Sequence, residues 1–385
     1  MYLDHNATSP LRPEALAAME RALLIGGNPS SVHAAGRAAR ALIEEARETV
    51  AGFASAESGE VIFTSGGAEA NALALRGAIA AAAEAEDRIT RLFVVATAHD
   101  SVRTVAVSLA ETTPGLKLSE IAVDANGRID PAAFRLQLMG GKGRALVSLI
   151  YVNNETGAVE DIASLATLIR AEAGEDALIH VDAVSSGYCP VRFADWDADY
   201  LSFSAHKLGG PQGAGALIAK DGAPLAPLFN GFQELRRRGG TENLSGIAGF
   251  AAAIRTFELN RDAELARVAS IRDRFERALR PLDATIFAKD AERAPNTTCF
   301  AVPGISAETA LMALDLDGIC VSSGAACSSG KVGRSHVLAA MGVSEELARC
   351  ALRASFGWNS TTDDADTAIA SLENLLARIA ARKAA

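Results

Sequence analysis

Helical patterns alternate with short apolar runs through the first two thirds of the chain. Periodic apolar positions predict a long amphipathic helix over residues 31–54, a strand over 60–65 and an alanine-rich helix over 68–83. Further strands are expected, separated by helical segments, near residues 92–97, 117–123, 145–152 and 177–182. Because alternating strands and helices build parallel sheets covered on both faces, the pattern predicts an α/β fold with a large, mostly parallel, doubly wound sheet.

The pattern changes after the turn at Gly239 and Gly240. A long helical stretch is expected over 242–279, and the remaining elements are strands at 297–302 and 351–356 and helices at 307–316 and 363–384. We expect this part to form a smaller α+β domain that the N-terminal dozen residues complete. The predicted division is a large domain over 13–258 and a small domain formed by 1–12 together with 259–385.

Composition and charge narrow the class of protein. Apolar residues make up 49% of the 385 positions, which is enough for a large folded core. The formal charge is −10, from 37 basic and 47 acidic residues without a basic block, and it argues against a nucleic-acid or membrane-surface partner. No run reaches the roughly 18 apolar residues of a membrane span, and no signal sequence is expected at the N-terminus. Five scattered cysteines without a CxxC pair predict a cytoplasmic protein, and six unclustered histidines predict no metal site.

One segment combines a lysine with donors for a phosphate. The apolar strand expected over 199–203 is followed by Ser204, His206 and Lys207, and then by a glycine-rich turn. A pyridoxal 5′-phosphate enzyme needs a lysine that forms a Schiff base with the cofactor aldehyde, and hydroxyl and imidazole groups that hold the phosphate. An ordinary basic residue after a strand remains the alternative for Lys207 taken alone.

Asp182 favours the cofactor interpretation. It ends the apolar strand expected over 177–182, about 25 residues before Lys207. Pyridoxal sites place a carboxylate against the pyridine nitrogen, and ligands of open α/β sheets lie at the carboxyl ends of strands, where both residues fall. The alternative is that Asp182 caps a helix.

A cysteine lies in a run of small residues. Cys327 falls within the Gly/Ser/Ala-rich segment 321–331, whereas Cys299 and Cys320 lie in apolar runs typical of structural cysteines. A thiol in such a loop is placed for access, as a nucleophile requires. A passive exposed cysteine is the alternative.

These segments resemble the cysteine desulfurases of the NifS/IscS type, within the class V aminotransferase group of pyridoxal phosphate enzymes of fold type I. The resemblance runs nearly end to end. The matching segments are residues 2–8, 27–31, 63–71, 99, 152–157, 182, 202–207, 240–243, 321–331 and 352–357.

The resemblance implies further cofactor contacts. His99, otherwise an ordinary loop histidine, corresponds to a residue that stacks on the pyridine ring and assists proton transfer. Gly67 and Ala68 correspond to the phosphate loop at a helix N-terminus. Asn154 corresponds to an asparagine beside the cofactor ring and the substrate.

The resemblance also implies how substrate and subunits are recognised. Arg353 corresponds to the arginine that binds the α-carboxylate of the substrate, and an internal salt bridge is the alternative. Asn28 is a candidate substrate contact. Thr241 corresponds to a threonine that reaches the phosphate of the other subunit, so a homodimer is expected.

Two positions depart from the family pattern. Ala68 stands where the family usually has threonine, which removes one hydroxyl contact to the phosphate. Near Ser185 the family normally has a glutamine that donates to the cofactor's ring oxygen, in a segment one residue longer, so here that glutamine is substituted or deleted. Both changes bear on cofactor affinity.

The sequence therefore predicts a pyridoxal phosphate-dependent cysteine desulfurase. We expect it to convert L-cysteine to L-alanine, to carry the sulfur as a persulfide on Cys327, and to deliver it to a sulfur-acceptor or iron–sulfur scaffold protein. The alternatives are a class V aminotransferase or lyase acting on another amino acid, and a cofactor-poor sulfur-transfer scaffold.

Overall fold

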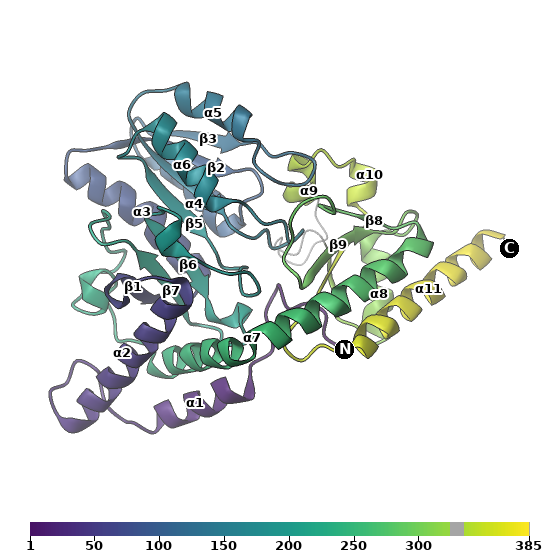
Figure 1. Ribbon diagram of the computed structural model, residues 1–385, viewed down its shortest axis with the longest axis horizontal. Helices are drawn as coiled ribbons and strands as arrows, with labels where there is room; N and C mark the ends of the chain where they lie inside the picture. The colour runs from purple at the N-terminus through teal and green to yellow at the C-terminus, as the bar shows by residue number, and fades with distance from the viewer. Residues whose placement is uncertain (324–334, 385) are drawn as a thin grey trace.

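The computed structural model describes residues 1–323 and 335–384, and two sheets organise this part of the chain (Figure 1). The larger sheet has seven strands in the order β1-β7-β6-β5-β4-β2-β3. Its strands are β1 (Val61–Thr64), β2 (Ile89–Val95), β3 (Lys117–Ile121), β4 (Arg144–Ile150), β5 (Leu178–Asp182), β6 (Tyr200–Ser204) and β7 (Gly215–Ala219).

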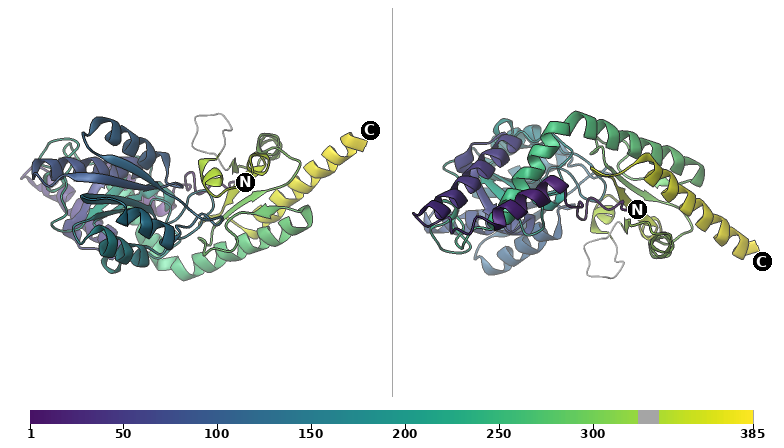
Figure 2. Two further views of the ribbon diagram at one scale, coloured as in Figure 1. Left: turned by 90° about the horizontal axis from the view of Figure 1, so that it is seen from above. Right: turned by 90° about the horizontal axis from the view of Figure 1, so that it is seen from below.

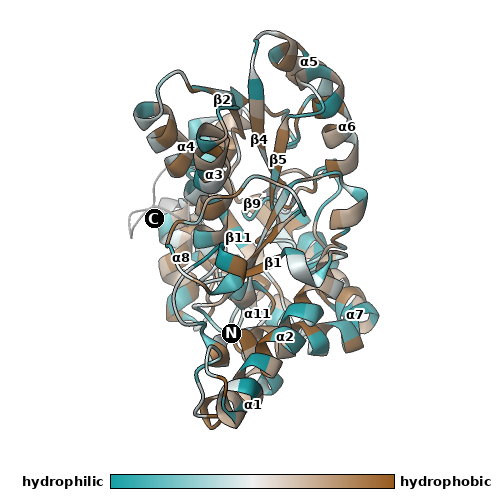
Figure 3. Cartoon of the chain, turned by 90° about the vertical axis from the view of Figure 1, so that its left-hand side faces the viewer, coloured by the Kyte–Doolittle hydropathy of each residue, from teal (hydrophilic) through white to brown (hydrophobic). Residues whose placement is uncertain are grey.

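The larger sheet is parallel from β3 through β6, and β7 pairs antiparallel with both β6 and β1. The predicted α/β class with a mostly parallel sheet is confirmed. Strands β4 and β5 carry the brown of hydrophobic residues in Figure 3, and almost every residue in them is buried. Continuous apolar strands of this kind require cover on both faces.

Helices supply that cover. Neighbouring strand residues point to opposite faces, so Phe63 joins the core under α2, α5, α6 and α7, whereas Ile62 joins the core under α3 and α4. The helices of this part are α1 (Pro13–Leu23), α2 (Ala34–Ala54), α3 (Gly67–Glu84), α4 (Asp100–Thr112), α5 (Pro131–Met139), α6 (Ile162–Ala173) and α7 (Leu244–Leu279).

The smaller sheet is antiparallel, in the order β10-β11-β9-β8. Residues of α7, α8 and α11 pack in one apolar cluster with β9 and β11. The elements are β8 (Thr285–Ile286), β9 (Thr297–Ala301), β10 (Ser322–Ser323), β11 (Ala351–Ser355), α8 (Ala307–Leu316), α9 (His336–Ala340), α10 (Glu345–Ala348) and α11 (Thr362–Ala384). Among the described residues, no helix is both long and apolar enough to cross a membrane.

Two connections join the halves. The N-terminal segment bridges to the smaller sheet, with Tyr2 beside Cys320 and Asp4 beside Ser355. Helix α7 runs from the larger sheet to the smaller one (Figure 2), and its buried residues divide accordingly, with Phe250 in the large core and Phe275 in the small one. The predicted division between residues 258 and 259 falls inside this continuous helix and stays a prediction.

Candidate active site

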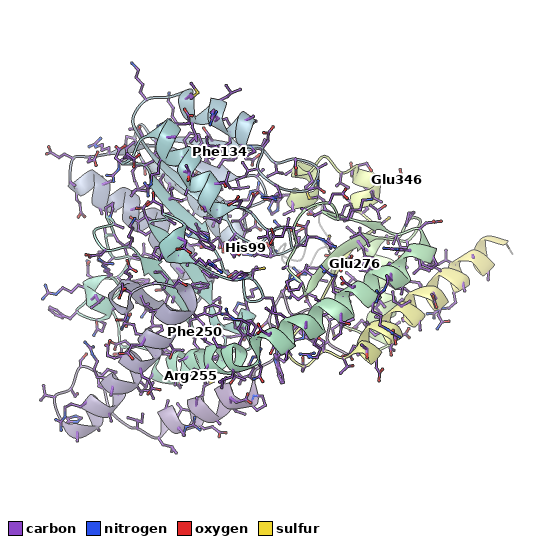
Figure 4. All side chains as sticks on the ribbon, in the orientation of Figure 1. His99, Phe134, Phe250, Arg255, Glu276 and Glu346 are labelled. Atoms are coloured by element: carbon purple, nitrogen blue, oxygen red, sulfur yellow. The ribbon has the colours of Figure 1, made fainter. Side chains whose placement is uncertain are left out.

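A cavity of about 320 Å³ lies where the carboxyl ends of the central parallel strands face the smaller sheet. The last residues of β4, β5 and β6, which are Ile150, Asp182 and Ser204, all line it. His99 is labelled at this junction in Figure 4. The complete lining is Asn6, Ala7, Gly67, Ala68, Asn71, His99, Ser101, Ile150, Asn154, Asp182, Val184, Ser185, Ser204, His206, Lys207 and Arg353.

The carboxylate of Asp182 is held from two sides. Its Oδ1 accepts the main-chain N–H of Val184 at 3.0 Å, and its Oδ2 accepts Nδ2 of Asn71 at 2.9 Å. A turn rather than a helix follows Asp182, so the helix-cap alternative does not apply. Neither partner was expected from the sequence.

A polar ladder lies inside the sheet two residues before Asp182. The imidazole of His180 is fully buried between Ser148 Oγ of β4, at 2.8 Å, and Ser202 Oγ of β6, at 3.0 Å. Burial lowers the pKa of His180 to about 4, although the negative charge of Asp182 acts to raise it. The ring is therefore neutral at physiological pH and links three adjacent strands below the site. The only sequence signal was a histidine inside an apolar strand.

Lys207 ends a short 3-10 turn that follows β6. Its Nζ donates to the main-chain oxygens of Asn6 and of Ala7, the latter at 3.0 Å. Beside it, His206 Nδ1 lies 3.1 Å from Thr8 Oγ1. Burial and the neighbouring Lys207 ammonium lower the pKa of His206 to about 4, so this imidazole is neutral too. The N-terminal segment thus forms one wall of the lysine site.

The turn before α3 allows a close approach of backbone to the cavity. Gly66 has φ of +150°, and helix α3 begins at Gly67 without a side-chain cap. A Cβ on Gly67 would lie 2.4 Å from Val184 Cγ2. Uncapped N–H groups at a helix N-terminus attract anions, so this end of α3 suits a phosphate, with Ser204 nearby on β6.

Arg353 on β11 is 1% exposed and reaches the same cavity. Its Nη1 donates to the main-chain oxygen of Asn154 at 2.9 Å, and its Nη2 donates to Asp4 Oδ1 at 2.7 Å. Its Nε is buried without a hydrogen-bond partner in the described part of the chain. The internal salt bridge that was the alternative therefore exists, on an arginine that also lines the cavity.

Glu155 is a buried acid next to this arginine that the sequence did not single out. Ser335, which caps α9, donates to Glu155 Oε2 at 2.5 Å. Burial raises the pKa of Glu155 to about 7, although Ser335 and the charge of Arg353 oppose the shift. The carboxyl therefore links the turn after β4 to Ser335, the residue that follows the segment 324–334.

The structure brings ten of the thirteen predicted site residues to one cavity. Asn28 is exposed between α1 and α2, where its Oδ1 accepts the N–H of Ser30 at 2.9 Å. Thr241 is exposed just before α7. Neither lines the cavity within this chain. Cys327 lies outside the described residues.

The residues present fit pyridoxal 5′-phosphate. One cavity offers a lysine amine in Lys207, a fixed carboxylate in Asp182 for a ring nitrogen, and uncapped helix N–H groups for a phosphate. A Cβ on Gly67 would lie 2.4 Å from Val184 Cγ2, so glycine at this position lets the N-terminus of α3 lie close to the cavity wall at Val184. The donor set therefore matches the cofactor that the sequence predicts.

Comparisons with known proteins agree with this site. The Aminotransferase class-V family matches residues 1–367. The chain is 41% identical over 372 residues to a cysteine desulfurase of Cereibacter sphaeroides, covering 95% of this chain and 93% of the relative. It is 37% identical over 385 residues to Cysteine desulfurase IscS of Dictyoglomus turgidum, covering 98% and 95%.

Solved structures give the same result. A structure titled NIFS-LIKE PROTEIN superposes with a TM-score of 0.90 at 29% identity, covering 98% of this chain and 99% of that one. A structure titled SspA in complex with cysteine superposes with a TM-score of 0.79 at 27% identity, covering 92% and 98%. These matches confirm the resemblance and the fold. The chain therefore belongs to the class-V aminotransferase family and, within it, to the pyridoxal phosphate-dependent cysteine desulfurases of the NifS/IscS type.

Proposed function

We propose that this cysteine desulfurase uses the cavity at the carboxyl ends of β4, β5 and β6 to convert L-cysteine to L-alanine, with Cys327 receiving the sulfur as a persulfide. The observation that carries the proposal is the convergence of Lys207, Asp182 and Arg353 on one cavity. These three side chains come from the end of β5, the turn after β6 and the distant strand β11, and each supplies one group that amino-acid chemistry with this cofactor needs.

The proposed cofactor contacts follow from the lining. Lys207 would hold pyridoxal 5′-phosphate covalently through its amine, and the carboxylate of Asp182 would hold the cofactor's ring nitrogen. Bound in this way, the cofactor supplies an electron sink for bonds at the substrate's α-carbon. The phosphate is held by the N-terminus of α3 and by side chains at the end of β6, and the ring by neighbouring polar groups. These contacts are assigned to Gly67, Ala68, Ser204, His206, Asn154 and Ser185.

The proposed roles of the protein groups give a balanced reaction. Arg353 orients the α-carboxylate of L-cysteine with its guanidinium, which Asp4 and the Asn154 carbonyl hold in place. His99 moves protons at the substrate. The thiolate of Cys327 forms a bond to the substrate sulfur as the C–S bond breaks, and the carbon left behind takes up a proton to become alanine.

A homodimer belongs to the same proposal. The loop before Thr241 exposes Phe229, Phe232 and Leu235 by 59%, 84% and 53%, which supports a second subunit that covers them. Its shape is fixed by a main-chain hydrogen bond of 2.7 Å from Gly239 to Phe229. In that dimer Thr241 reaches the phosphate of the partner. Asn28 stays a candidate substrate contact.

The destination of the sulfur and the compartment are also proposed. A relative is named IscS, and an iron–sulfur scaffold or another sulfur acceptor is the proposed recipient. The four cysteines in the described residues, Cys189, Cys299, Cys320 and Cys350, form no disulfide. Unpaired thiols support a cytoplasmic location.

The direct test is turnover of L-cysteine without a keto acid. The wild-type enzyme should release alanine, and sulfide in the presence of a thiol reductant, in equal amounts. An aminotransferase would require a keto acid, and a lyase acting on another amino acid would leave L-cysteine unchanged. Lys207→Ala should abolish the release. Lys220→Ala is the matched control, because Lys220 pairs with Asp197 at the surface at 3.0 Å. Equal loss in both variants would contradict the site.

A further inference from the structure

Asn71 connects Asp182 to a second helix. It lies on α3, is 1% exposed, and donates through Nδ2 to Asp182 Oδ2 at 2.9 Å and to Ser101 Oγ at 3.0 Å. Its Oδ1 is buried and has no hydrogen-bond partner among the described residues. A flipped amide would point this oxygen at the carboxylate, so the charge of Asp182 fixes the orientation of the amide. In this orientation Oδ1 has no hydrogen-bond partner among the described residues, but Nδ2 can donate to both Asp182 and Ser101.

Ser101 carries the connection to His99. Its Oγ accepts from Asn71 and lies 2.8 Å from His99 Nδ1, and its main-chain N–H donates to the same Nδ1 at 3.1 Å. His99 is the N-cap of α4, so the main-chain bond requires a lone pair on Nδ1. The hydroxyl hydrogen of Ser101 must then also point toward Nδ1. The neutral ring consequently carries its proton on Nε2.

We propose that Asn71 and Ser101 are positioning residues that join Asp182 and His99 into one hydrogen-bonded unit and hold His99 in the Nε2–H tautomer. The effect on catalysis rests on the proposed function, because it assigns Asp182 to the cofactor ring and His99 to proton transfer. The tautomer itself follows from the contacts of Ser101. The unit joins α3, α4, β5 and the loop that leads into α4. A displacement of Asp182 is therefore transmitted to His99, and a displacement of His99 to Asp182.

A merely structural role would be to hold α3 against α4. A second contact between the same two helices serves as the control for that role, because Arg76 of α3 donates to Ser108 Oγ of α4 at 3.2 Å. Neither of these residues lines the cavity. Ser108→Ala therefore removes a serine contact between the same helices without touching the proposed unit.

The experiment measures the tautomer and the kinetics on the full-length enzyme. In ¹⁵N-histidine-labelled protein, with His99→Gln to assign the resonance, the wild-type ring should show an unprotonated Nδ1 and a protonated Nε2. Ser101→Ala should move the Nδ1 resonance. Ser101→Ala and Asn71→Ala should each lower kcat by roughly 10- to 100-fold with KM for L-cysteine within about twofold. Ser101→Thr keeps the hydroxyl and should restore most of kcat.

The double variant tests whether the pair acts as a unit. Asn71→Ala combined with Ser101→Ala should be no slower than the slower single variant, because the connection is already broken. A protonated Nδ1 in the wild type, a double variant whose losses multiply, or a Ser108→Ala variant that is equally slow would each overturn the proposal. Failure of the wild type to release alanine would reject the proposed function instead, and the tautomer would still be decided by the resonance.

Discussion

Acidification should weaken this protein through one buried histidine. His180 has a pKa of about 4 in the folded chain, below its ordinary value of 6.5, because burial disfavours the charged ring. The unfolded chain binds the proton more readily, so stability is present in full above pH 6.5 and is lost as pH falls toward 4. With these two values, the folded state loses about 2 kcal/mol between pH 7 and pH 5 through this group, and about 3 kcal/mol by pH 4.

The assay compares the wild type with His180→Gln, which keeps polar atoms between the two serines but cannot titrate. Urea unfolding followed by circular dichroism should find the variant less stable at pH 7, and the gap should shrink by about 2 kcal/mol at pH 5. The other histidines are shared by both proteins and cancel in the difference. Ser148→Ala removes a hydrogen bond of 2.8 Å but keeps the imidazole, so it should retain the pH slope of the wild type. A gap that does not change with pH would refute the reasoning.

Three further changes test other parts of the site. Burial raises the pKa of Glu155 from 4.5 to about 7, so the wild type loses stability as pH rises through that window. In urea unfolding, the stability of Glu155→Gln relative to the wild type should increase by about 2 kcal/mol between pH 5 and pH 8. The same stability difference at both pH values would contradict this. Gly67→Ala places a Cβ 2.4 Å from Val184 Cγ2 and should weaken cofactor retention about tenfold or more by absorbance titration, whereas Gly52→Ala, with open space around it, should not. Arg353→Lys keeps the charge but loses the planar fork, so KM for L-cysteine should rise roughly tenfold, and a change in kcat alone would speak against carboxylate binding.

Much of the site was predictable because strand ends are predictable. Asp182 and Lys207 follow apolar runs, and the carboxyl ends of neighbouring parallel strands meet at one edge of a sheet. The antiparallel strand β7 was not predicted. Its residues Gly215–Ala219 follow a glycine-rich turn, and their apolar run gives no direction of pairing.

The contacts that orient the site residues were not predictable, because they join distant segments. Arg353 and Asp4 are 349 positions apart, and Asn71 and Asp182 are 111 apart. No local period records such pairs, since only the folded topology brings them together. The buried acid Glu155 was missed for a related reason: it sits in a turn segment, where acidic residues are usually solvated.

The central claim is that sulfur passes from L-cysteine to Cys327. The decisive measurement is the mass of the peptide that contains Cys327 after incubation with L-cysteine without reductant. The wild-type peptide should gain about 32 Da, the mass of one sulfur atom. Cys327→Ser should gain nothing and release no sulfide, while Cys320→Ser, which replaces an exposed cysteine of the described residues, should behave as the wild type. Undiminished release of alanine and sulfide by Cys327→Ser would contradict the account.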